Sequence, residues 1–320
     1  LSYFEHSNYV PMLKRSYELW DQLDSTLLRR SGVVYFGPAG SQIIAGVLKS
    51  ATEHQLEVEA AAENSLPQFS PPSGFTALRE ADAGWLPVEQ CVLAHLEQAT
   101  AAGAEHRWGE SVVDWQAVPS GVEVSTENGK YSAAAMVVAG GAWSSRLLQA
   151  LELPLTVYRK HLHWFRCDDH RYQSGFFFDL PHGQFYGFPT TQGRLKVAEH
   201  SGGEVVSDPF AASRAPDSAD AQRIEAFVHD HLSGLVGERV DHQTCFYTRT
   251  PDEHFILDRY PGTKNVSFAA GLSGHGFKFV PVLGEALVDL ATGRSPAFDC
   301  GFLTLSRFGR QGQVLDAFQD

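Results

Sequence analysis

Concentrated positive charge is missing from this sequence. Its 320 residues carry 25 Lys and Arg against 38 Asp and Glu, a net charge of −13, and no block of basic residues occurs. Nucleic acids and anionic membrane surfaces require a basic face on the proteins that bind them. No run of 18 apolar residues and no charged-then-apolar leader is present, so we expect no membrane partner and a cytoplasmic location.

Clustered cysteines are missing as well. The four cysteines are Cys91, Cys167, Cys245 and Cys300. They lie far apart, without CxxC or zinc spacing, which indicates a reducing compartment. Two HxH pairs occur, at 161–163 and 229–231, but no third ligand follows either pair at metal-binding spacing. We therefore predict that no metal is bound.

Several signatures of catalysis do not occur in the chain. It has no GxGxxG dinucleotide fingerprint, no phosphate-binding loop, no Ser-hydrolase elbow and no zinc-deaminase pattern. These absences argue against the commonest nucleotide-binding and hydrolytic functions. What the chain does contain is a pattern of alternating helices and strands.

Apolar periodicity predicts a mixed α and β chain of about two domains. The expected helices cover residues 8–23, 42–54, 84–102 and 222–232 and a run that ends at Gly293. The expected strands cover residues 31–41, 122–126, 130–138, 158–166, 175–180 and 265–270. The Pro- and Ser-rich segments 64–78 and 207–219 are expected to be loops.

Two glycine-rich turns each follow a strand and precede a helix. Gly271, Gly274 and Gly276 follow the strand 265–270, and Gly140 and Gly141 follow the strand that ends at Val138. Such turns let a ligand approach the backbone closely, and a helix N-terminus favours an anion. The order G-x-x-G-x-G is not the dinucleotide fingerprint, so a plain βα turn stays open as the alternative.

The segment GLSGHGFKF, preceded by CFYTRTPDEHFILD, resembles a known flavoenzyme family. This pair of motifs is similar to that of the monomeric sarcosine oxidase and N-methyltryptophan oxidase family, FAD-dependent amine oxidases of the D-amino acid oxidase-like superfamily. YGFP followed by LKVAEH, and VVAGGAWSSRLL, extend the likeness. The resemblance covers the chain to Phe308.

The resemblance implies an α/β (α+β) fold with two interleaved domains. A glutathione-reductase-like FAD-binding domain would take residues 1–28, 90–155 and 255–320, and a substrate domain with a mixed sheet would take 29–89 and 156–254. The family's first βαβ unit, which carries GxGxxG, and its substrate-binding Arg would fall before Leu1. The FAD-binding domain is thus expected to be truncated at its N-terminus.

The same resemblance implies roles for individual residues. Lys196 would activate oxygen, Lys278 would bind the substrate carboxylate, and Tyr186 and His200 would line the substrate site. Cys245 would hold FAD through a covalent thioether. The further positions implied to contact the cofactor are Val113, Gly140, Gly141, Trp143, Gly274, His275, Gly276, Phe277 and Lys278. Those implied to lie near the substrate are Tyr3, Glu5 and Tyr9.

The implied activity is oxidation of an N-methyl L-amino acid, of the N-methyl-L-tryptophan or sarcosine type. Dioxygen would be the acceptor, and the products would be formaldehyde, hydrogen peroxide and the demethylated amino acid. A monomer is expected. The missing GxGxxG unit supports an alternative, namely an inactive or partner-dependent fragment that does not bind FAD alone.

Overall fold

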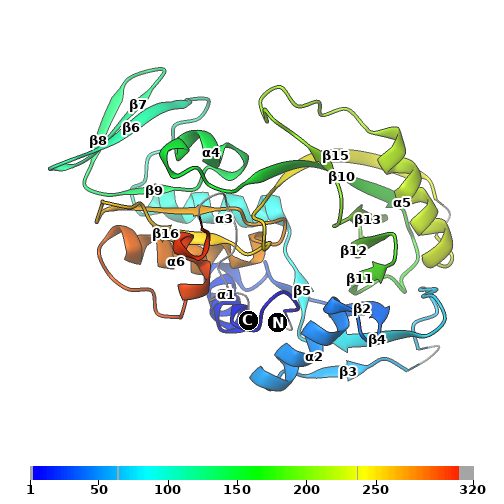
Figure 1. Cartoon of the computed structure of the whole chain (residues 1–320). Coiled ribbons are helices and arrows are strands. Elements are labelled where there is room, and N and C mark those ends of the chain that lie inside the picture. Colours follow the sequence, from blue (N-terminus) through cyan, green and yellow to red (C-terminus); the bar gives the residue numbers. More distant parts are fainter. Residues whose placement is uncertain (1–2, 63–64, 236, 310–320) are drawn as a thin grey trace.

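The computed structural model describes residues 3–62, 65–235 and 237–309, which form two lobes (Figure 1). The helices of these residues are α1 (Tyr9–Asp24), α2 (Gln42–His54), α3 (Val88–Ala101), α4 (Ser144–Leu147), α5 (Ser218–His231) and α6 (Val280–Ala291). Short 3-10 helices are η1 (Gly141–Trp143), η2 (Gln149–Leu151), η3 (Phe277–Phe279), η4 (Gly301–Leu303) and η5 (Leu305–Arg307). No helix in this part of the chain is long and apolar enough to span a bilayer.

The strands complete the secondary structure of the described residues. They are β1 (Arg29–Arg30), β2 (Val33–Pro38), β3 (Val58–Ala60), β4 (Phe75–Glu80), β5 (Gly84–Trp85), β6 (Val112–Val118), β7 (Gly121–Thr126), β8 (Lys130–Ala133), β9 (Met136–Val138), β10 (Thr156–Arg166), β11 (Gly175–Leu180), β12 (Gly183–Thr191), β13 (Arg194–Glu199), β14 (Glu204–Val205), β15 (Arg239–Arg249), β16 (Ile256–Arg259) and β17 (Val266–Ala270).

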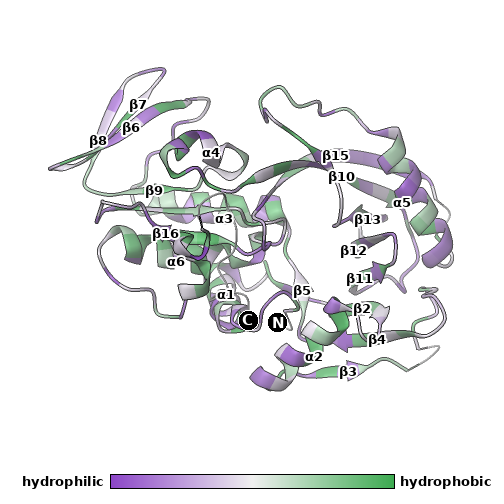
Figure 2. Ribbon diagram, in the orientation of Figure 1, coloured by the Kyte–Doolittle hydropathy of each residue, from purple (hydrophilic) through white to green (hydrophobic). Residues whose placement is uncertain are grey.

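One lobe is built on a three-stranded sheet in the order β16-β17-β9. The central strand β17 is parallel to β9, and all five of its residues are buried, as the run VSFAA predicts for a strand covered on both faces. α6 packs against this sheet and against α1, and Figure 2 shows α6 as predominantly hydrophobic. The buried residues of α6 are Val282, Leu283, Ala286, Leu287 and Ala291.

The other lobe is built on a mixed sheet in the order β14-β10-β13-β12-β11-β2-β4-β3, with β15 paired to β10 as its ninth strand among the described residues. Side chains alternate across the sheet, so Phe176 and Phe178 of β11 face α5 and contact Phe227, whereas Phe177 points to the opposite face. α5 thereby closes one face of the sheet. The opposite face points toward the other lobe, where Phe177 contacts Phe4.

Four predicted boundaries were wrong. Residues 75–78, assigned to the loop 64–78, open β4 because they pair with β2; Asn64 itself lies outside the described residues. α3 begins at Val88, because Gly84–Trp85 pair with β1 as a short strand. The predicted strand 130–138 divides into β8 and β9, which pair in different sheets.

The fourth correction concerns α5, which begins at Ser218 rather than at residue 222. The carboxylate of Asp217 accepts a hydrogen bond of 2.7 Å from the Asp220 backbone N–H, which is a standard helix N-cap. The strands of the nine-stranded sheet all lie within 29–89 and 156–254. The proposed domain limits themselves stay a prediction.

Candidate active site

The face of the large sheet opposite α5 carries several of the predicted site residues. In the strand register Trp164 of β10 pairs with Lys196 of β13, and Lys160 of β10 pairs with Cys245 of β15. Directly paired residues of antiparallel strands project from the same face. Lys196 and Cys245 therefore share a face, on strands that flank β10.

Lys196 is enclosed by aromatic rings. Its Nζ lies 5.4 Å from the ring centroid of Trp164 and 5.2 Å from that of Phe188, within the range of a cation–π contact. Burial lowers the pKa of Lys196, and the nearby Cys245 opposes that effect. The structure thus places an ammonium group in a partly desolvated aromatic setting close to a thiol.

The Cys245 thiol is half-buried. Burial raises its pKa, while Lys196, Lys160 and Arg214 act in the opposite direction. A thiol reacts as its thiolate, so the neighbouring cations favour the reactive form. This environment suits a cysteine that forms a bond to a cofactor, although attachment itself stays a prediction.

Tyr186, Tyr247 and His200 form a cluster beside these groups. The His200 ring lies 5.5 Å from the Tyr247 ring and 6.4 Å from the Tyr186 ring. A side-chain hydrogen bond joins the two tyrosines, and it lowers the pKa of Tyr247 against the larger effect of burial, which raises it to about 12. Burial, followed by the charges of Arg249, Lys160 and Lys278, lowers the pKa of His200 to about 3.

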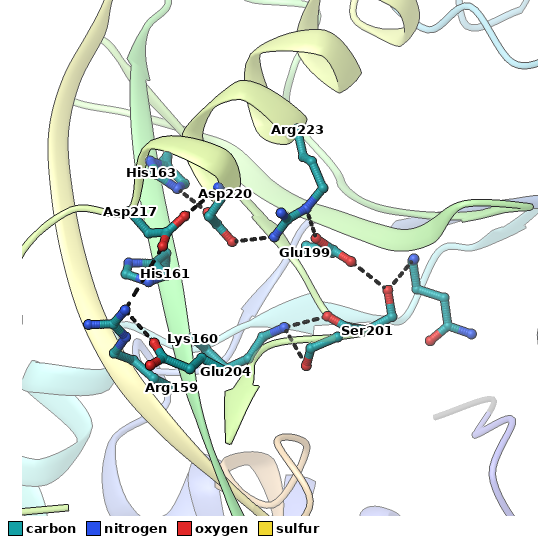
Figure 3. Close-up of polar contacts among 12 residues, drawn as sticks. Arg159, Lys160, His161, His163, Glu199, Ser201, Glu204, Asp217, Asp220 and Arg223 are labelled. Carbon is teal, nitrogen blue, oxygen red and sulfur yellow. Dashed lines mark hydrogen bonds and ion pairs between the residues drawn. The ribbon is translucent and has the colours of Figure 1, made fainter. Parts of the chain in front are cut away.

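A polar network on the α5 side holds the segment that carries His200. Figure 3 shows the chain of contacts that runs from His163 through Asp220, Arg223 and Glu199 to Ser201. Its distances are 2.7 Å for His163 Nε2 to Asp220, 3.0 Å for Arg223 Nε to Glu199 and 2.9 Å for the Ser201 hydroxyl to Glu199. These contacts on the α5 side of the sheet therefore hold the turn after β13 in place.

The glycine turn after β17 contacts the large sheet through Tyr247 of β15. Gly274 has φ +87°, and a Cβ there would lie 2.3 Å from Cε2 of Tyr247. Only glycine permits both that backbone angle and that contact. The Ser273 N–H also donates to the Thr248 carbonyl at 2.9 Å. The predicted glycine motif is thus joined to the strand of Cys245.

A second group of predicted residues lies on the other side of this junction. The Tyr3 hydroxyl hydrogen-bonds His275 Nδ1, and His275 Nε2 lies 3.0 Å from the Glu253 carbonyl. Because a carbonyl only accepts, His275 carries its proton on Nε2 and accepts from Tyr3. The Lys278 Nζ lies 4.5 Å from the Tyr3 ring centroid. Tyr9 is buried in the same cluster and accepts from the Phe255 N–H at 3.1 Å.

Glu5 is the acidic member of this second group. Burial raises its pKa to about 7, while Lys278 acts in the opposite direction. Its Oε1 lies 4.0 Å from His275 Nε2, and its Oε2 is buried without a hydrogen-bond partner among the described residues. Burial in turn lowers the pKa of Lys278, which Glu5 opposes. A carboxyl group and an ammonium group are thus held together in a nearly dry setting.

The other glycine motif reaches the same strand from the opposite face. Gly140 and Gly141 follow β9, and Trp143 lies 6.4 Å, ring to ring, from Phe246 of β15. The Trp143 Nε1 is buried without a hydrogen-bond partner in the described part of the chain. Val113, by contrast, is 54% exposed on β6 and lies apart from these groups.

The structure therefore gathers most of the predicted residues around the junction of Tyr247 and Gly274. Sequence reasoning missed Tyr247, Lys160 and Arg249. Tyr247 and Arg249 lie two and four residues after Cys245, so the two-residue period of a strand was the signal that could have found them. Among the described residues, no group of three or more His, Cys, Asp or Glu is arranged to hold a metal ion.

The residues present fit a bound flavin along β15. Cys245 and Lys196 share one face of the sheet, and the buried Trp143 Nε1, which lies toward the opposite face of β15, is an unused donor. A family model described as FAD dependent oxidoreductase matches residues 1–290. The chain belongs to this FAD-dependent oxidoreductase family, which confirms the predicted family and fold class.

Particular relatives place the chain within the family. It is 37% identical to N-methyl-L-tryptophan oxidase of Salmonella agona, over 97% of this chain and 86% of that protein. It is 34% identical to monomeric sarcosine oxidase of an Arthrobacter species, over 96% of this chain and 83% of that one.

Solved structures show the same fold. NikD, an amino acid oxidase of nikkomycin biosynthesis, superposes in its Tyr258Phe mutant form with a TM-score of 0.83 at 24% identity, over 94% of this chain and 83% of that one. Glycine oxidase from Geobacillus kaustophilus gives a TM-score of 0.81 at 20% identity, over 95% and 84%.

Proposed function

We propose that this FAD-dependent amino acid or amine oxidase oxidises N-methyl L-amino acids, of the N-methyl-L-tryptophan or sarcosine type. The reaction consumes the N-methyl amino acid, dioxygen and water, and yields the demethylated amino acid, formaldehyde and hydrogen peroxide. The observation that carries the proposal is that Lys278 acts on His200, whose ring contacts Tyr247 and Tyr186. Lys196 lies on the same face of the sheet as Cys245, and the chain has relatives of these two activities.

The cofactor would be held by the two glycine motifs and by Cys245. Gly140, Gly141 and Trp143 would contact it from one side, and residues 274–278 from the other. When bound, FAD accepts the two electrons of the amine and passes them to dioxygen. We propose that the Cys245 thiol attaches it covalently, which the cations beside that thiol support.

Lys278 would bind the substrate carboxylate. Its ammonium group lies in a buried setting beside Tyr3, where an ion pair is stronger than in water. Tyr186 and His200 would line the same site. With its pKa near 3, His200 stays neutral at physiological pH and adds no charge that would compete with Lys278 for the carboxylate.

Lys196 would assist the reaction with dioxygen. The first electron transferred to dioxygen creates a negative charge, and a fixed cation nearby lowers the barrier to that step. The aromatic rings around Lys196 hold its ammonium group in place. The two lysines thus divide the work, because one binds substrate and the other stabilises a charge that develops.

The proposal is tested by the visible absorption spectrum of the purified chain, followed by acid precipitation. We expect a flavin spectrum, with colour that stays in the pellet and becomes extractable in the Cys245→Ser variant. Peroxide release with N-methyl-L-tryptophan and with sarcosine then tests the substrate class. A colourless chain would favour the alternative of a fragment that does not bind FAD alone, and a yellow chain without peroxide release would refute the N-methyl substrate.

A further inference from the structure

Arg249 belongs to the wall of the site but has no role in the function proposed so far. It follows Cys245 by four residues and Tyr247 by two, so all three project from one face of β15. Its guanidinium carbon lies 5.2 Å from the Tyr158 ring centroid and 5.9 Å from that of Tyr247. The side chain is 15% exposed, which places its charge inside the wall.

The hydrogen bonds of Arg249 leave one donor unused. One terminal nitrogen donates to the His200 carbonyl at 2.7 Å, and the other lies 3.4 Å from the Glu253 carboxylate, whose side chain is half-exposed. Nε is buried and has no hydrogen-bond partner within the described residues. A buried, charged donor without a partner is unfavourable, so this position suits an acceptor that arrives with a ligand.

Lys160 brings a second cation to the same place. Its Nζ donates to the carbonyls of Ser201 and Gly202, as Figure 3 shows, and lies 5.5 Å from the Tyr247 ring. Lys160 is 3% exposed. Arg249 and Lys160 therefore bind successive carbonyls of the turn 200–202 and both flank Tyr247.

Positive charge exceeds negative charge around this turn. Glu199 and Asp220 are already bound by Arg223, which leaves the partly exposed Glu253 as the carboxylate that contacts Arg249. Arg249, Lys160 and Lys278 all act on His200, whose ring contacts the two tyrosines. The α-carboxylate of an amino acid would occupy Lys278, which leaves Arg249 with the half-exposed Glu253 as its carboxylate partner and with Nε unused.

We propose that Arg249 selects substrates with a second anionic group, namely N-methyl amino acids whose side chain ends in a carboxylate. The side-chain carboxylate accepts a hydrogen bond from Arg249 Nε, and Lys160 adds attraction from the other side of Tyr247. This inference rests on the proposed function and names its substrate class. It makes Arg249 a specificity-determining residue rather than a catalytic one.

The test compares kcat/KM for N-methyl-L-glutamate with kcat/KM for N-methyl-L-alanine. We expect the native chain to prefer the acidic substrate, and Arg249→Met to reduce that preference by about 10- to 100-fold, the value of a hydrogen bond to a charged group. Arg249→Lys keeps the charge and is expected to keep part of the preference.

Arg29 offers a matched control. Its guanidinium carbon lies 4.8 Å from the Trp85 ring centroid and it donates to the Gln90 side-chain oxygen at 3.3 Å, so it also stacks on a ring and makes a hydrogen bond. It is exposed on β1, which does not belong to the large sheet. Arg29→Met removes the same charge and is expected to leave the ratio of acidic to neutral substrate unchanged.

A binding measurement separates this inference from the proposed function. Calorimetric titration with glutarate and with butyrate compares a dicarboxylate with a monocarboxylate without turnover. We expect tighter binding of glutarate, lost in Arg249→Met. If no N-methyl amino acid is oxidised but this preference holds, the proposed function fails and the anion site stands. Equal binding of both ligands, or a preference unchanged in Arg249→Met, overturns the inference.

Discussion

Lys196 and Lys278 show how one side-chain type serves two ends of a site. Lys278 lies beside the acidic Glu5, whereas Lys196 lies between the rings of Trp164 and Phe188 with a thiol nearby. Burial strengthens the attraction between the Lys278 ammonium group and an arriving carboxylate. The rings around Lys196 hold its charge where it can act on a negative charge that develops nearby.

The role of Lys196 is tested by Lys196→Met. We expect reoxidation by dioxygen to slow by about 10²- to 10³-fold, because one preorganised charge is lost at the place where negative charge develops. Reduction by substrate under anaerobic conditions should change little. Stopped-flow absorbance measures both rates.

Lys130→Met supplies the control for this substitution. Lys130 is exposed on the outer strand β8, so the variant loses the same charge far from the sheet wall. Equal slowing of the two half-reactions in Lys196→Met would contradict the role in oxygen activation.

At the residue scale, the sequence singled out individual residues but not the contacts between them. Cys245 and Lys278 stand in recognisable motifs, and their proposed roles stay predictions. Tyr3 and His275, however, are separated by 272 positions and joined by a hydrogen bond. No local pattern reports such a contact, since it arises only when the lobes fold.

At the scale of elements, the turn between β17 and α6 joins the two lobes. Its glycine at 274 makes room for the Tyr247 ring, and its backbone bonds the strand that carries Cys245. The turn thereby positions Lys278, the residue proposed to bind the substrate carboxylate, relative to the large sheet.

The contact between Gly274 and Tyr247 is tested by Gly274→Ala. The added Cβ would lie 2.3 Å from the Tyr247 ring in a backbone of φ +87°, so we expect a loss of unfolding free energy of about 2–4 kcal/mol from strain and overpacking. Chemical denaturation measures the loss. We also expect a larger KM, since the ring of Tyr247 must move.

Gly262→Ala isolates the strain from the clash. Gly262 has φ +77° and no atom within 4 Å of an added Cβ, so this variant is expected to lose only about 1 kcal/mol. Equal losses in the two variants would mean that contact with Tyr247 contributes nothing.

Element boundaries were predicted less well than element types. Gly84–Trp85 read as the start of a helix and form a strand, because Arg29–Arg30 offer a partner from a distant part of the sequence. The segment 130–138 read as one strand, and its halves join different sheets. In both segments the strand partner determined the secondary structure, and the local sequence pattern does not reveal which strand that partner is.

At the scale of the whole molecule, buried histidines predict sensitivity to acid. Burial lowers the pKa of His200 to about 3, that of His254 to about 4, and that of His275 well below its usual value. The unfolded chain binds these protons near pH 6.5 and the folded chain does not, so stability falls as pH decreases below 6.5. Glu5, with its pKa raised to about 7, acts in the opposite direction down to about pH 4.5.

From these four groups we expect the unfolding free energy to fall between about pH 6 and pH 4.5 by about 2.7 kcal/mol per pH unit, which corresponds to a net of two protons. Burial also lowers the pKa of His95, His161 and His242, which steepens the fall. Denaturant titrations at several pH values measure this slope. His200→Gln should remove about one proton from it. A free energy that is constant over this range would show that these histidines are not buried in neutral form.

The contact between Tyr247 and Gly274 has a consequence for how the molecule tolerates change. The Tyr247 ring packs directly against the backbone at Gly274, and this contact sets the distance between the β17–α6 turn and the large sheet. Outlying parts such as the hairpin of β7 and β8 contribute nothing to it. The periphery is therefore free to vary in length and composition, whereas a shift at this one joint would alter which molecules the enzyme accepts.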